Sequence, residues 1–305
     1  MRRLSVQHTT VYRYAEPVGL GEHRLMCRPR ESHDLRLIKT RLAIAPQPKD
    51  LHWLHDVFDN SVAVATFSGE TAELRFDSEV TIELTETALP DYRLETEART
   101  FPFAYSPDER PELERALERR HPAVEVDRWA ARFLPASGSQ DTMSLLHAMT
   151  VGIHEQFIYS RRTERGIQTP SETLQRGRGT CRDFALLMME GVRALGLAAR
   201  FVSGYVFVPG PALAAGQGST HAWLQVYLPG AGWVDFDPTN RIIGTRNLIR
   251  VAVAWDPAHV LPLWGTFTGS RSSYLGMEVT VRVVDETHPS RRTVDEEDFP
   301  SYSPT

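Results

Sequence analysis

The residue in this sequence best suited to covalent chemistry is Cys181, one of only two cysteines among 305 residues. It follows Gly179 and Thr180 and begins an apolar run whose spacing predicts a helix. The start of a helix offers unpaired backbone N–H groups and a positive dipole end, which lower the pKa of a thiol and can receive an oxyanion. We therefore expect Cys181 to act as a thiolate nucleophile, with its own backbone N–H as an oxyanion donor.

Two downstream residues supply the other side chains that a thiol enzyme needs. His221 can take the thiol proton and return it to a leaving group, and Asp237 can fix the imidazole tautomer. The three predict a Cys-His-Asp triad that attacks amide or ester acyl groups through a thioester, which water or an amine would resolve. Asp235 competes with Asp237 for the third place, because residues two apart on a strand share a face.

The triad needs a strand pair to bring its last two members together. The segments 222–228 and 233–236 alternate like strands, and Pro229-Gly230-Ala231-Gly232 between them is typical of a hairpin turn. In a hairpin the start of the first strand lies opposite the end of the second. His221 and Asp237 are therefore expected to be neighbours.

Two other features lie close to the triad in sequence. Asp183 comes two residues after Cys181, and we expect it to cap the helix, outside the triad. The segment 209–220, rich in glycine, alanine and proline, directly precedes His221. Its composition fits a loop that lines or covers the site equally well as a plain surface loop.

The remaining histidines form no strong metal signature. His147 and His154 are seven residues apart on a predicted helix and share a face, but two ligands without a cysteine make a weak zinc site. His52 and His55 fall on opposite faces if their segment is a strand. No glycine loop of the phosphate-binding kind is present. We expect neither a metal nor a cofactor.

The composition and charge of the chain limit the kinds of partner that it is expected to bind. The net charge is −5, from 34 basic and 39 acidic residues that are interspersed, which argues against nucleic acid. Cys27 lies far from Cys181 in an apolar stretch, so a disulfide framework is not expected. The sequence contains no run of 18 apolar residues, so we expect neither a membrane-spanning segment nor a membrane partner. We expect a soluble, cytoplasmic protein with a protein or peptide substrate, and the oligomeric state stays open.

The first part of the chain has the periodicity of strands. The whole chain, at 305 residues, is longer than the roughly 250–300 residues at which a single hydrophobic core stops growing, which favours two domains. Alternating runs at 36–44, 61–67 and 79–84 are separated by proline, glycine and asparagine turn positions. We expect a β-rich, antiparallel, sandwich-like domain over residues 1–95.

The second part changes to a helical period. Helices are expected at 124–133 and 141–157, followed by the cysteine helix and then by strands, which predicts an α+β catalytic core over residues 96–250. Residues 251–285 are expected to form strands that return to the β domain or to the sheet. Residues 286–305, acidic and containing prolines, are expected to be mostly disordered.

The chain resembles the transglutaminase-like superfamily. The blocks that carry the resemblance are Gly179-Thr180-Cys181-Arg182-Asp183-Phe184-Ala185, residues 193–205, His221-Ala222-Trp223 and residues 232–240. Segments 8–14 and 56–62 are similar to the β-rich N-terminal region of bacterial members. The resemblance implies a papain-like core of helices packed on an antiparallel sheet, in which Cys181, His221 and Asp237 match the nucleophile, the base and the orienting carboxylate.

The resemblance covers roughly residues 1–285 and has two departures. Asp59 occupies a turn position where the family pattern favours glycine. Residues 254–259 replace the Gly-Arg-Asp-Tyr segment that usually follows the core, a change that bears on the substrate cleft.

Three functions are compatible with these residues. The first is hydrolysis of protein or peptide amides, as a peptidase or amidase with a Cys181 thioester. The second is true protein-glutamine gamma-glutamyltransferase activity, in which a lysine amine replaces water. The third is a catalytically silent protein-binding module, against which the presence of all three triad residue types argues.

Overall fold

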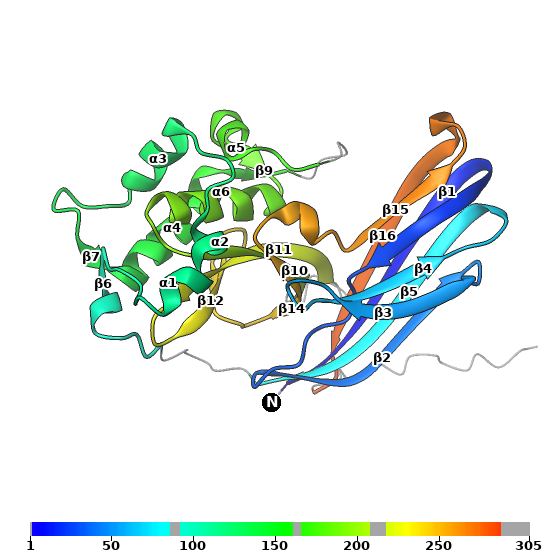
Figure 1. Cartoon of the computed structure of the whole chain (residues 1–305), viewed down its shortest axis with the longest axis horizontal. Helices are drawn as coiled ribbons and strands as arrows, with labels where there is room; N and C mark the ends of the chain where they lie inside the picture. Colours follow the sequence, from blue (N-terminus) through cyan, green and yellow to red (C-terminus); the bar gives the residue numbers. More distant parts are fainter. Residues whose placement is uncertain (1, 86–91, 161–165, 208–217, 288–305) are drawn as a thin grey trace, which may run out of the picture.

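The computed structural model describes residues 2–85, 92–160, 166–207 and 218–287. Helices packed on a five-stranded sheet form one part of the molecule, and a long curved sheet forms the other (Figure 1). The predicted α+β class and the antiparallel N-terminal β domain are both confirmed.

The N-terminal domain is a single antiparallel sheet. Its strands run in the order β2-β5-β1-β4-β3, and β15 and β16 also pair with β1. The strands are β1 (Arg2–Leu25), β2 (Leu35–Ala45), β3 (Asp50–His55), β4 (Ser61–Thr66), β5 (Glu70–Leu84), β15 (Leu263–Thr268) and β16 (Tyr274–Asp285). Alternate residues of β1 are buried at Leu4 and Val6, as the two-residue period of a strand requires. One face of the sheet therefore lies on the core of the molecule.

The α+β core has helices first and strands afterwards. Its sheet runs in the order β13-β12-β11-β10-β14. The strands are β10 (Ala199–Phe207), β11 (Gly218–Leu228), β12 (Gly232–Asp237), β13 (Ile242–Ile243) and β14 (Leu248–Ala254). The helices are α1 (Glu109–Glu112), α2 (Glu114–Leu117), α3 (Val124–Ala131), α4 (Thr142–Gln156), α5 (Pro170–Arg176) and α6 (Cys181–Ala194). The short elements are β6 (Thr100–Phe101), β7 (Gln140–Asp141), β8 (Ile158–Tyr159), β9 (Arg178–Gly179), and the 3-10 turns η1 (Glu97–Arg99), η2 (Pro257–His259) and η3 (Arg271–Ser273).

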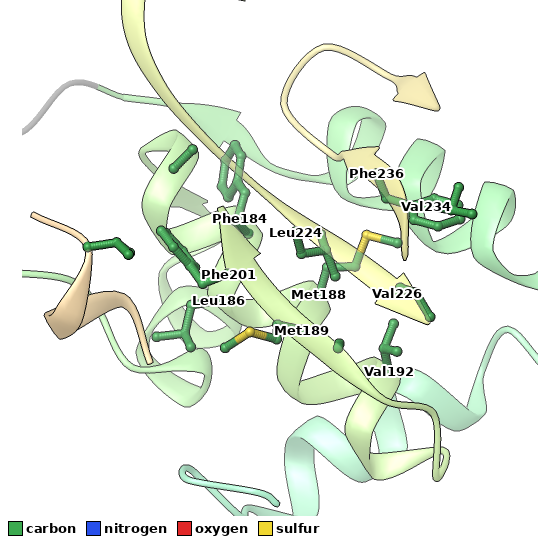
Figure 2. Packing of buried hydrophobic residues seen from close by; sticks show 14 of the residues in the cluster. Phe184, Leu186, Met188, Met189, Val192, Phe201, Leu224, Val226, Val234 and Phe236 are labelled. Atoms are coloured by element: carbon green, nitrogen blue, oxygen red, sulfur yellow. The ribbon is translucent and has the colours of Figure 1, made fainter. Parts of the chain in front are cut away.

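The cysteine-bearing helix α6 is the centre of this core. Its residues from position 183 to 193 are buried. Figure 2 shows it packed against β10, β11 and β12 through Phe184, Leu186, Met188, Met189, Val192, Phe201, Leu224, Val226, Val234 and Phe236. Burial of each large apolar side chain contributes about 1.5–3 kcal/mol. The helix is thus held firmly on the sheet that carries His221 and Asp237.

A buried ion pair ties α6 to the rest of the core. The side chains of Glu190 and Arg193 are both fully buried, and Arg193 Nη1 donates to Glu190 Oε1 at 2.9 Å. Glu190 also accepts the backbone N–H of His121 at 3.0 Å. Because Glu190→Ala would leave an uncompensated buried guanidinium, we expect it to lower the free energy of unfolding by about 3–5 kcal/mol.

Urea unfolding measures this loss. Glu118→Ala is the control, since Glu118 pairs with Arg115 on the surface and its loss is expected to cost at most about 0.5 kcal/mol. Equal effects of the two substitutions would contradict a structural role for the buried pair.

The turn between β3 and β4 fastens the β domain to the core. Asn60 is fully buried, donates to the carbonyl of Val253 at 2.8 Å and accepts its N–H at 2.9 Å. Phe58 packs edge-on against Trp255, with ring centroids 5.8 Å apart. Asp59 has φ of 63°, the left-handed region that favours glycine, so this turn keeps the glycine conformation without the glycine.

The C-terminal part of the chain is shared between the two sheets. The strand β14 borders the core sheet beside β10, whereas β15 and β16 lie beside β1. Of the tail expected to be disordered, residues 288–305 lie outside the described residues. The domain boundaries at residues 95, 250 and 285 stay predictions.

Among the described residues, no helix combines the length and apolar composition needed to cross a membrane.

Candidate active site

Cys181 is the first residue of α6, at the helix start that the sequence predicts. Directly before it, β9 pairs in parallel with β8, so that Tyr159 lies beside Gly179. A helix leaves its first N–H groups without intrahelical partners, and the Cys181 N–H is one of them. The sulfur therefore lies beside backbone donors that can stabilise negative charge.

Asp183 holds the helix start in shape. Its carboxylate Oδ2 accepts the backbone N–H of Thr180 at 2.7 Å, and Oδ1 accepts that of Gln168 at 2.7 Å. Gln168 Nε2 also donates to Oδ2 at 3.1 Å. The side chain is fully buried and acts as a helix cap, the role expected of it.

The hairpin of β11 and β12 brings His221 and Asp237 together. Nε2 of His221 lies 2.8 Å from Oδ2 of Asp237, and both residues are buried. The other carboxylate oxygen of Asp237 accepts the backbone N–H of Thr239 at 2.9 Å. Because Asp237 is an acceptor, Nε2 carries the proton, and Nδ1 is the nitrogen left for exchange with the thiol.

The competing carboxylate has a different partner. Asp235 is buried and accepts the indole N–H of Trp223 at 2.6 Å. The ring of Trp223 lies roughly parallel to that of His221, with centroids 6.0 Å apart. The two aspartates share a face, as strand alternation requires, but they contact different residues of β11: Asp235 contacts Trp223, and Asp237 contacts His221. Asp237 is thus the carboxylate in contact with the imidazole.

The three groups shift one another's acidity. Burial raises the pKa of Cys181, but hydrogen bonding to His221 and the charge of its imidazole bring the pKa below its ordinary value. Burial lowers the pKa of His221, but the Asp237 carboxylate and the sulfur raise it to about 10. Burial likewise raises the pKa of Asp237, which the His221 charge and nearby donors bring below its usual range. A thiolate facing an imidazolium is therefore favoured at neutral pH.

The backbone N–H of Ala222 and the guanidinium of Arg182 also lower the Cys181 pKa. Arg182 Nη2 donates to the carbonyl of Pro257 at 2.9 Å, and its guanidinium lies 5.3 Å from the ring centroid of Phe201. The positive charge next to the Cys181 thiol is thus held by contacts with η2 and β10.

Gly204 leaves the room that Trp223 occupies. It lies opposite His221 in the β10–β11 ladder, and a Cβ there would be 2.1 Å from the Ile249 carbonyl oxygen and 2.9 Å from Trp223 Cη2. We expect Gly204→Ala to lower the free energy of unfolding by about 1–3 kcal/mol, because either the neighbouring strand β14 or the indole of Trp223 must shift to make room for the methyl group. Denaturant unfolding and Cys181 alkylation measure the effect. Wild-type values for both would contradict this role.

Sequence reasoning missed one further polar contact in the site. Asn240 Nδ2 lies 2.7 Å from Asp237 Oδ2 and 3.2 Å from His221 Nε2. An amide three residues after the aspartate, in a Pro-Thr-Asn turn, was the available signal.

The other candidates lie apart from the triad or outside the described residues. His154 contacts the carbonyl of Thr239 at 2.7 Å through Nδ1, and His147 is exposed on the same helix. His52 pairs with Asp50 on the exposed strand β3. Within the described ranges no three or more His, Cys, Asp or Glu side chains gather as metal ligands. Of the predicted loop, residues 218–220 begin β11, and 209–217 lie outside the described residues.

Comparisons with known proteins agree with this architecture. Residues 4–83 match the bacterial transglutaminase-like N-terminal region, and residues 130–238 match the transglutaminase-like superfamily. An uncharacterized protein of Mycobacterium tuberculosis is 30% identical over 303 residues, which cover 92% of each chain. An uncharacterized protein of Mycobacterium leprae is 26% identical and covers 92% of this chain and 99% of its own.

A solved structure shares the fold. It is the "Putative Cysteine Protease" from Cytophaga hutchinsonii, with a TM-score of 0.64 and 15% identity over 93% of this chain and 98% of that one. Sequence and structure together show that this chain belongs to the transglutaminase-like superfamily, whose members are usually cysteine enzymes.

Proposed function

We propose that this chain is a cysteine-dependent hydrolase of amide bonds in proteins or peptides. The observation that carries the proposal is the imidazole of His221, which is held at Nε2 by Asp237 at 2.8 Å and which lowers the pKa of the Cys181 thiol. This is the arrangement in which a carboxylate orients a base and the base activates a nucleophile.

In the proposed reaction the Cys181 thiolate attacks the substrate carbonyl carbon and forms a C–S bond. The backbone N–H of Cys181 is placed to donate to the resulting oxyanion. As the C–N bond breaks, Nδ1 of His221 gives its proton to the leaving amine, and a thioester remains. Water then loses a proton to Nδ1 and attacks the thioester, so that the C–S bond breaks and the acid leaves.

Exposed side chains beside the start of α6 support hydrolysis over transfer to an amine. Cys181 is only partly buried. Ile158 and Tyr159, on the strand paired with the segment before it, are 70% and 50% exposed. A true transglutaminase needs a cleft that keeps water from the thioester, because water otherwise competes with the amine.

The test uses a glutamine-containing peptide and an unfolded protein, each with and without a primary amine. New N-termini would identify a peptidase, and ammonia release alone an amidase. Amine incorporation that exceeds hydrolysis would contradict the proposal and favour cross-linking. If wild type and Cys181→Ala gave the same absence of products, the silent binding module would be the better account.

The compartment and substrate class belong to the same proposal. We propose a cytoplasmic enzyme that acts on protein or peptide chains without nucleic acid or membrane partners. Cys27 and Cys181 are both free, which is compatible with a reducing compartment and with a reactive thiol.

A further inference from the structure

Asn240 lies at the edge of the triad, three residues after Asp237. Its side-chain Nδ2 is 2.7 Å from Asp237 Oδ2 and 3.2 Å from His221 Nε2. We propose that Asn240 is a positioning residue, whose amide holds the Asp237 carboxylate where it receives the Nε2 proton of His221. The inference rests on the proposed function, since it concerns the same reaction.

The hydrogen bonds around Asp237 define what Asn240 adds. Oδ1 accepts the backbone N–H groups of Thr239 at 2.9 Å and Asn240 at 3.3 Å. Oδ2 receives two donors, Nε2 of His221 at 2.8 Å and Nδ2 of Asn240 at 2.7 Å. Because Nε2 is itself a donor here, the amide of Asn240 acts on the carboxylate and not on the imidazole. Without it, Oδ2 would be held by His221 alone.

The turn that carries Asn240 is fixed independently of its side chain. The backbone N–H groups on Oδ1 close the turn, and Nδ1 of His154 on α4 contacts the Thr239 carbonyl at 2.7 Å. Arg241 completes the turn with φ of 56°. Asn240 is exposed, so trimming its side chain leaves no cavity. Its loss is therefore expected to affect the site without unfolding the turn.

The expected consequence is that a smaller fraction of Cys181 is present as thiolate. If the carboxylate can rotate, the imidazole loses its fixed orientation, and Nδ1 faces the sulfur for less of the time. The midpoint of Cys181 reactivity should then rise by about one pH unit, which lowers the alkylation rate about tenfold at pH values below the wild-type midpoint.

The experiment measures the pH dependence of Cys181 alkylation by iodoacetamide in the full chain. Asn240→Ala should show the tenfold loss and the higher midpoint, and Asn240→Gln, which keeps an amide donor on an exposed side chain, should restore most of the rate. Thr239→Ala is the matched control in the same turn, because its hydroxyl has no hydrogen-bond partner among the described residues. All three should unfold at the wild-type denaturant concentration.

Several results would overturn the inference. An Asn240→Ala profile that overlays wild type would do so, and so would an equal loss in Thr239→Ala or a lowered unfolding midpoint, which would indicate a merely structural residue. Slow alkylation of Cys181 in the wild type would instead refute the proposed function itself.

Discussion

Asp237→Asn is expected to lower turnover by about 10³–10⁴-fold with the fold intact. The two side chains have the same shape, but the amide can present N–H where the carboxylate accepts. Nε2 of His221 would then become an acceptor, and its proton would move to Nδ1, where it blocks uptake of the thiol proton. Steady-state kinetics on the peptide that the wild type hydrolyses measures the loss, and circular dichroism checks the fold.

Asp235→Asn is the matched control on the same strand. Asparagine keeps an oxygen acceptor for the Trp223 indole, and it is Asp237 that contacts the imidazole, so we expect turnover within about tenfold of wild type. If the Asp235 substitution were as damaging as the one at Asp237, the assignment of the orienting carboxylate would be wrong.

Cys181→Ala is expected to lower turnover by about 10⁴-fold or more, because no thioester can form without the sulfur. The change removes one partly buried atom, so the unfolding midpoint should stay close to wild type. Product analysis by mass spectrometry measures the residual turnover against a buffer blank.

Cys27→Ala distinguishes a nucleophile from a thiol in general. Cys27 is buried in a second apolar cluster, and burial raises the pKa of its thiol, so it is expected to contribute packing and no chemistry. Full turnover with some loss of stability is the expected result. Residual hydrolysis by Cys181→Ala above a few hundredths of the wild-type rate, lost only when Cys27 is also replaced, would contradict the proposed nucleophile.

The positions of the triad residues were predictable because each depends on local rules. A glycine turn before an apolar helix placed Cys181 at a helix start, and the turn at residues 229–231 brings the end of β12 back beside the first half of β11. The turn residue Asp59 was also noted, and its positive φ gives the physical reason for the glycine pattern.

The remaining features depend on side-chain packing and on pairing across long sequence distances. Periodicity could not separate Asp235 from Asp237, because the two differ only in their partners. The indole N–H of Trp223 donates to Asp235, and Asp237 is the carboxylate that contacts His221. Residues 251–285 were expected to return to the β domain or to the sheet, but the partner strand was left open. Strand β16 pairs with β1, from Asp285 opposite Leu4 onward, and no local pattern specifies which distant strand becomes the partner. The amide of Asn240 acquires its role only once the turn has formed.

The most direct test of the account is the pH dependence of iodoacetamide labelling at Cys181 and Cys27, followed by peptide mass spectrometry in wild type and His221→Gln. The account predicts that Cys181 reacts much faster than Cys27 near neutral pH, with a midpoint below that of an ordinary thiol, because imidazolium persists up to a pH of about 10. In His221→Gln the midpoint should rise to the ordinary range. Equal, slow labelling of both cysteines that does not respond to the loss of His221 would contradict the account.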